Sequence, residues 1–274
     1  MNTATHTTTK AETNAGPLAR ALASRTWRHQ GRHITLVPLG AGLALVVLLL
    51  VLPRVYPEGI HGGVTSASSG LATVTGLHDT TGAALGAALL SAPGLLGVAA
   101  ALITLSISRA VIAGDLTSGV MEALLATPVR LRAVFLAYTG TALAAALLAW
   151  LTLVAAFTGP AWAVLTAGGG HVRLTTGYVL LGVLVPAGSM LWAASVTVFT
   201  AFLYPAGLRA TAGLNGGLVR AAALLPALGA TLAVTLAPER YTRVTAWYAG
   251  GSLTLATALL AAVPLVFKAD RVLE

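Results

Sequence analysis

The sequence predicts an all-α, polytopic membrane protein with six transmembrane helices, and two observations lead to this fold class. First, six long stretches contain no Asp, Glu, Lys, Arg or His. A helix rises about 1.5 Å per residue and needs about 20 apolar residues to cross a bilayer's hydrocarbon core. Second, the chain is 57% hydrophobic and only 9% charged, whereas about 25% of the residues in soluble domains are charged. The six predicted spans, within a membrane domain of residues 34–267, are residues 34–52, 82–107, 133–157, 177–204, 221–237 and 244–267.

The basic residues predict how these helices are oriented. If the N-terminus is cytoplasmic, six spans place twelve of the sixteen Lys and Arg residues inside. Cytoplasmic loops typically carry such an excess of Lys and Arg. We therefore expect a multi-pass protein of the cell (cytoplasmic) membrane with both termini in the cytoplasm. The net charge of +8 is explained by this orientation, which argues against nucleic acid as a partner.

The two ends of the chain are predicted to be cytoplasmic. Residues 1–33 form a tail in which residues 17–32 place Leu22 and Trp27 among four arginines. This pattern favours a short helix lying at the headgroup level of the membrane. A basic tail without fixed structure is the alternative. Residues 268–274 are predicted to form a short tail after the last span.

Several kinds of chemistry are excluded or disfavoured. The chain has no Cys, so it forms no disulfide or thiolate metal site. The predicted spans contain no His for haem ligation, and no Asp or Glu. Ion-coupled carriers usually keep an ionisable residue at membrane depth, so a secondary carrier is disfavoured. No catalytic motif is present, and we expect neither an enzyme nor a cofactor or metal site in this chain.

The chain also lacks a nucleotide-binding loop of its own. Such a loop needs a Gly-Lys pair followed by Ser or Thr, because glycine amides and the lysine ammonium hold the phosphates. Lys10 and Lys268 are the only lysines, and neither follows a glycine. Any ATP hydrolysis linked to this protein must therefore take place in a partner chain.

The segment between the second and third predicted spans carries a more specific pattern. Asp115 is predicted to be the N-cap of a short helix that ends at Thr127 and Pro128. Basic residues at both ends of the segment place it on the cytoplasmic side. A cytoplasmic amphipathic helix is therefore expected here. Its apolar residues at helical spacing are Leu116, Val120, Met121, Leu124 and Leu125.

Residues 114–129 read Gly-Asp-Leu-Thr-Ser-Gly-Val-Met-Glu-Ala-Leu-Leu-Ala-Thr-Pro-Val. This order resembles the signature of ABC type-2 transporter permeases. In that family an acidic, Gly-containing stretch precedes a hydrophobic residue, Glu, two leucines and Thr-Pro or Ser-Pro. The chain departs from the pattern at residues 116–118, where the family often has Arg or Lys with Glu. It departs again at Val120-Met121, where the family commonly has Thr-Leu.

The resemblance implies a function. In the family this segment is the coupling helix, which docks into a groove of a separate ABC ATPase subunit that binds ATP and magnesium. Glu122 would contact that ATPase or brace the loop. Six spans make half of the family's usual pathway, so a second permease copy or a homologue would complete an export dimer. The residues implied in coupling are Asp115, Gly119, Met121, Glu122, Leu124, Leu125, Thr127 and Pro128.

Two other functions stay open. An ion-coupled carrier or channel would use the same apolar architecture without an ATPase. A non-transporting membrane subunit would engage an ATPase for mechanical work on another protein. Whether residues 115–129 bind an ATPase separates the first alternative from the ABC permease. Stimulation of ATP turnover by a small substrate separates the ABC permease from the second alternative.

Overall fold

The computed structural model describes residues 15–51, 80–126, 131–167, 176–203, 214–236 and 241–266. Within these ranges the chain forms helices joined by turns, without a strand. The elements are α1 (Ala15–Val46), the π-helical segment η1 (Val47–Val51), α5 (Thr80–Thr117), α6 (Val120–Leu125), α7 (Leu131–Ala167), α8 (Thr176–Leu203), α10 (Leu214–Leu236) and α11 (Tyr241–Val266). The predicted all-α class is confirmed for this part of the chain.

Five helical segments are long and apolar enough to cross a membrane. They correspond to five of the predicted spans, and are Gly16–Val51, Ser91–Ile112, Arg132–Val164, Thr176–Leu203 and Arg243–Ala262. The remaining predicted span, residues 221–237, coincides with α10. Its apolar part, Gly217–Leu232, is shorter than the other five. A sixth crossing therefore stays a prediction.

Large apolar side chains cover much of the outer surface of the bundle. Trp247 is 76% exposed, Leu218 65% and Leu225 62%. An outer surface with many exposed apolar side chains promotes association in water, whereas in a bilayer it contacts acyl chains. The long apolar helices together with this surface indicate a multi-pass membrane protein.

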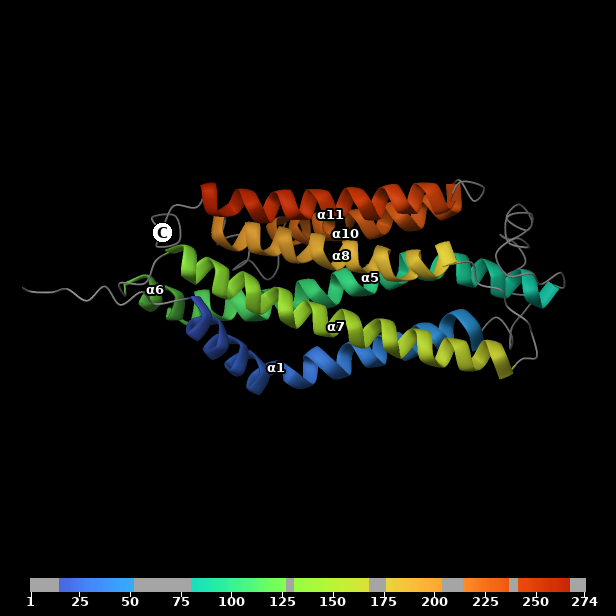
Figure 1. Cartoon of the computed structure of the whole chain (residues 1–274), viewed down its shortest axis with the longest axis horizontal. Coiled ribbons are helices and arrows are strands. Elements are labelled where there is room, and N and C mark those ends of the chain that lie inside the picture. The colour runs from blue at the N-terminus through green and yellow to red at the C-terminus, as the bar shows by residue number, and fades with distance from the viewer. Residues whose placement is uncertain are drawn as a thin grey trace, which may run out of the picture.

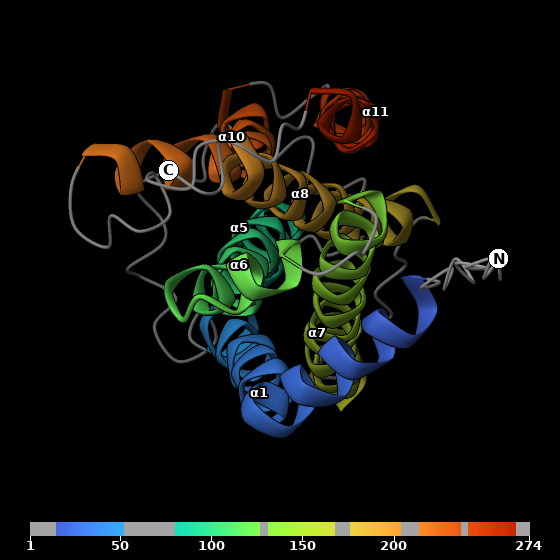
Figure 2. The same ribbon diagram turned by 90° about the vertical axis from the view of Figure 1, so that its left-hand side faces the viewer.

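The helices form an elongated bundle with α5 and α8 near its centre (Figures 1 and 2). α1 and α7 pack along each other on one side, and α10 and α11 pack against α8 on the other. The first turns of α1, the short helix α6 and the last turns of α11 lie at the same end of the bundle (left in Figure 1). We call this the α6 end.

Small residues allow the helices to approach closely. A Cβ added at Gly42 of α1 would lie 2.9 Å from the carbonyl oxygen of Leu153 and 2.7 Å from Cβ of Ala156. A Cβ added at Gly188 of α8 would collide with Ser252 of α11. In lipid no hydrophobic force drives helices together, so their association depends on close packing of this kind.

The first helix differs from its predicted boundaries. A separate interfacial helix over residues 17–32 and a span beginning at residue 34 were expected, but α1 runs unbroken through both. The alternative, an unstructured tail over residues 17–32, is wrong. Figure 1 shows the first turns of α1 at an angle to the rest. Pro38 lies within α1 and removes a backbone donor, which favours bending. The predicted tails at residues 1–14 and 268–274 lie outside the described residues.

Candidate functional site: the α5–α6 junction

Gly119 lies in the turn between α5, which ends at Thr117, and α6, which begins at Val120. The amide of Ser118 donates to the carbonyl of Gly114 at 3.1 Å, which closes the last turn of α5. The amide of Ala123 donates to the carbonyl of Gly119 at 3.0 Å, which opens α6. Gly119 has φ of 73°, a left-handed conformation that glycine adopts without steric cost. The chain therefore changes direction at this residue.

The prediction that Asp115 caps the short helix is wrong. α5 continues to Thr117, so Asp115 lies in its last turn, and Gly119 occupies the position before α6. The predicted apolar stripe is also interrupted. Leu116 belongs to α5, whereas Val120 and Leu124 belong to α6, beyond the turn at Gly119. The spacing of the apolar residues suggested one continuous helix, because it carries no information on where the backbone changes direction.

α6 lies between α5 and α7, where the sequence predicts a short helix, but it has only six residues. Leu124 is half-buried and packs against the main apolar core. The backbones of Met121, Glu122 and Leu125 belong to α6, and the roles expected of their side chains lie outside the described features. Thr127 and Pro128 also lie outside the described residues.

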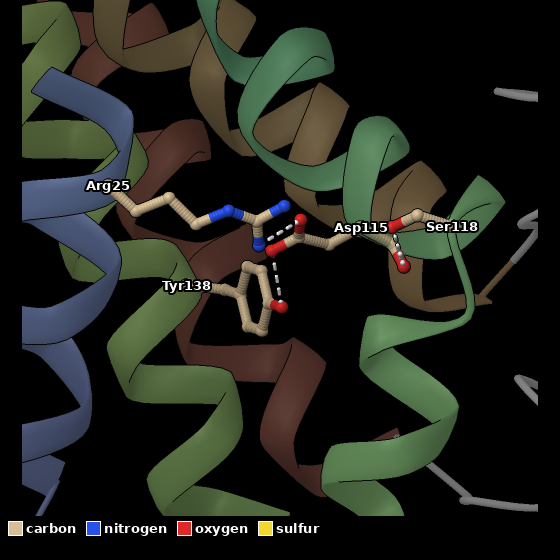
Figure 3. Close-up of polar contacts among 4 residues, drawn as sticks. All are labelled: Arg25, Asp115, Ser118 and Tyr138. Atoms are coloured by element: carbon tan, nitrogen blue, oxygen red, sulfur yellow. Dashed lines mark hydrogen bonds and ion pairs between the residues drawn. The ribbon is translucent and has the colours of Figure 1, made fainter. Parts of the chain in front are cut away.

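An ion pair with a buried carboxylate anchors the α5 side of this junction (Figure 3). Nη1 of Arg25, from α1, lies 2.6 Å from Oδ1 of Asp115. The hydroxyl of Tyr138, from α7, donates to Oδ2 of Asp115 at 2.8 Å. Asp115 is only 6% exposed, and Tyr138 is fully buried. The carboxylate thus joins three helices at the root of α6, and we call Arg25, Asp115 and Tyr138 the α6 anchor.

The position of Asp115 makes these partners necessary. A helix carries partial negative charge at its C-terminus, so a carboxylate in the last turn of α5 is unfavourable by itself. Burial removes water from the carboxylate, which is strongly unfavourable for a charged group without a partner. Arg25 supplies the compensating positive charge, and its side chain is about half exposed, at 47%. The anchor is therefore buried on the carboxylate side and open to solvent on the guanidinium side.

A small cavity of about 170 Å³ adjoins the anchor between α1 and α5. Its lining includes Arg25, His29 and Gln30 from α1 and Gly114 and Asp115 from α5. Within the described ranges, no cluster of three or more His, Cys, Asp or Glu side chains could hold a metal ion. The polar groups gathered here suit a structural junction.

Sequence reasoning identified Asp115 and Gly119 but missed Arg25 and Tyr138. Arg25 was grouped with the orientation charges, and Tyr138 lies within a charge-free span. The available signal was Asp115 itself, since an acidic residue that ends an apolar helix needs a cation. Several arginines could have supplied it, and only the packing of α1 against α5 and α7 selects Arg25.

Comparisons of the chain with protein-family models, curated proteins and solved structures found no match. The fold and the α5–α6 junction therefore carry the functional argument.

Proposed function

We propose that this chain is the permease subunit of an ATP-driven ABC exporter of the type-2 kind, working as a dimer in the cytoplasmic membrane. Residues 114–129 are its contact with a separate ATPase subunit, which binds ATP and magnesium. The second permease is another copy or a homologue. The observation that carries the proposal is α6, a short helix that follows the turn at Gly119 and is fixed at its root by the ion pair between Arg25 and the buried Asp115.

The position of α6 supports a docking role. It lies at one end of the bundle, between two long apolar helices (Figure 1). A simple hairpin between α5 and α7 needs no additional helix, and a six-residue helix is too short to be stable without tertiary contacts. Leu124 supplies one such contact by packing on the core. α6, with the sequence Val-Met-Glu-Ala-Leu-Leu, also contains the Glu and the two leucines of the permease signature.

The α6 anchor suggests how movement would be transmitted. Because Asp115 is bonded to α1 and α7 as well as being part of α5, a displacement of α6 acts on three helices together. An ATPase that binds α6 differently in its open and closed states would shift the balance between two packings of the bundle. Asp115 would then act as a positioning residue, since its buried carboxylate is unavailable to a partner.

The orientation supports the same reading. The parts of α1 and α7 nearest the α6 end carry four arginines. Three belong to α1 and one to the first turn of α7: Arg25, Arg28, Arg32 and Arg132. Under the positive-inside rule this end faces the cytoplasm, where an ATPase would be located. If α10 also crosses the membrane, the chain has six crossings, and α11 ends on the cytoplasmic side, where α1 begins.

Affinity purification of the tagged chain from its native membranes, followed by mass spectrometry, tests the proposal. A soluble ATP-binding subunit should be recovered in stoichiometric amount, and should be lost when Glu122→Ala and Leu125→Ala are combined. Leu255→Ala with Arg243→Gln, two exposed positions on α11, is the matched control and should retain the partner. Recovery of the chain alone, in several detergents and with ATP present, would instead indicate an autonomous carrier or channel.

A second measurement separates the exporter from a mechanical subunit. ATP hydrolysis by the recovered complex should rise when the correct small substrate is added. ATPase binding without stimulation by any candidate solute, but with stimulation by a co-purified membrane protein, would favour the non-transporting subunit.

A further inference from the structure

We propose that the exposed side of α1 from Trp27 to Thr35 binds the phosphate group of an anionic phospholipid. The surface there is hollowed into an open cleft of about 540 Å³. Trp27, Arg28, His29, Arg32 and His33 contribute to its lining. Two arginines one helical turn apart can direct their guanidinium groups at one phosphate, a ligand that arginine recognises particularly well.

Within the described ranges, no ion pair compensates the positive charge of the cleft arginines. The carboxylates in the described ranges are those of Asp115 and Glu122, and Asp115 is already paired with Arg25. The interaction found for Arg28 is a long contact of 3.4 Å from its Nη2 to the hydroxyl of Ser24. Both Arg28 and Arg32 are exposed. An anion from outside the described chain would therefore meet two exposed guanidinium groups that no described carboxylate pairs.

The cleft lies where the polar and apolar surfaces of α1 meet. Immediately after it, Leu36 is 61% exposed and Val37 48%, so the next turn presents apolar side chains to the acyl region. Trp27 is 54% exposed, and tryptophan favours the interface between headgroups and acyl chains. A ligand with a phosphate and acyl chains matches both parts of this surface. Free phosphate matches only one.

Gly31 lies next to the Trp27 indole, and both residues line the cleft. A Cβ added at this position would lie 3.4 Å from two carbons of the Trp27 indole, so the ring lies over Gly31 along the helix. The flat ring then forms an apolar wall beside the two arginines, suited to the glycerol and first acyl carbons of a lipid.

This site is separate from the α6 anchor, although His29 lines both the cleft and the cavity beside Asp115. The inference requires a membrane-embedded chain but no ATPase partner. Lipid retention therefore tests it independently of the proposed function.

The test is native mass spectrometry of the full chain in mild detergent after incubation with phosphatidylglycerol or phosphatidylcholine. We expect tight retention of phosphatidylglycerol alone. Each interfacial charge strengthens binding to anionic lipid about fivefold, so Arg28→Gln with Arg32→Gln should weaken retention about thirtyfold. Arg28→Lys with Arg32→Lys keeps the charge and should retain most of the lipid.

A second pair of substitutions distinguishes a site from general attraction. Arg20→Gln with Arg220→Gln removes the same charge from exposed positions outside the cleft and should leave retention within about twofold. Equal losses in the two glutamine pairs would overturn the proposal. Displacement of the lipid by inorganic phosphate at equal concentration would also overturn it, because the site would then recognise phosphate alone.

Discussion

The guanidinium of Arg25 and the carboxylate of Asp115 join the first part of α1 to the last turn of α5, with Nη1 and Oδ1 2.6 Å apart. This pair sets the geometry at the root of α6, because the reversal at Gly119 begins only a few residues later. The two charges differ in environment. Asp115 is buried, whereas Arg25 is about half exposed, so removing one is not equivalent to removing the other.

Loss of the positive charge should destabilise the protein more than loss of an ordinary surface charge. Arg25→Gln leaves the buried carboxylate with the Tyr138 hydroxyl as its remaining described partner. Breaking a buried pair costs about 3–5 kcal/mol and an exposed pair about 0–1, so this half-exposed pair should cost about 2 kcal/mol. Thermal unfolding in a fixed detergent measures the change. Arg20→Gln, an exposed position on the same helix, should change stability by less than about 0.5 kcal/mol.

Tyr138 should contribute through Asp115 and not through packing alone. Tyr138→Phe removes a hydrogen bond to a charged group, which typically contributes about 1.5–3 kcal/mol. In an Asp115→Ala background the same substitution should cost much less, so a double-mutant cycle should give a coupling of about 1 kcal/mol or more. Thr152, whose hydroxyl bonds within α7 to Leu148, supplies the control: Thr152→Val should be additive with Asp115→Ala. Additivity of Tyr138→Phe as well would contradict the anchor.

The charge-free runs predicted the all-α class and six spans, and five of these coincide with long apolar helices. The absence of charge over about 20 residues is a strong, local signal. Helix ends were less predictable. The third run was expected over residues 133–157, but α7 extends from Leu131 to Ala167. The helix continues past Pro160, which lies inside it. The hydrocarbon core requires apolar residues only over its own thickness, so a helix can extend beyond the apolar run that crosses it.

The position of the candidate site in the chain could be predicted from the sequence, but the residues that come together there could not. The Gly-Asp pattern and the leucines of α6 marked the segment in which α5 ends and α6 forms, because turn and helix signals are local. The partners of Asp115 come from α1 and α7, and no spacing in the sequence relates those helices to residue 115. The same limit explains the incorrect N-cap assignment. An Asp before apolar residues looks like a cap unless its carboxylate is known to point at a distant arginine.

The reversal at Gly119 should be sensitive to a side chain. Gly119→Ala places a Cβ in the left-handed region at φ of 73°, which costs about 1–2 kcal/mol. Gly119→Asn should cost less, since asparagine tolerates this conformation. Binding of the proposed ATPase partner should fall together with stability if α6 is displaced. Both quantities can be measured on the same purified complex.

Gly114→Ala is the matched control for this prediction. Gly114 lies in α5, and a Cβ there would meet nothing within 4 Å. Alanine should stabilise the helix by about 0.5–1 kcal/mol. Two glycines five positions apart in one segment are thus expected to respond with opposite signs. Equal responses would show that the backbone at Gly119 is free to relax.

The crossing of α1 and α7 should depend on Gly42. A Cβ there would lie 2.9 Å from the Leu153 carbonyl oxygen and 2.7 Å from Ala156 Cβ. Neither atom belongs to a flexible side chain, so Gly42→Ala must separate the helices and should cost about 1–3 kcal/mol. Gly40→Ala, two residues earlier on the same helix, would meet nothing within 4 Å and should be neutral or slightly stabilising. Thermal unfolding of both variants in one detergent decides the matter. A Gly42→Ala variant as stable as Gly40→Ala would mean that α1 and α7 do not pack this closely in the membrane.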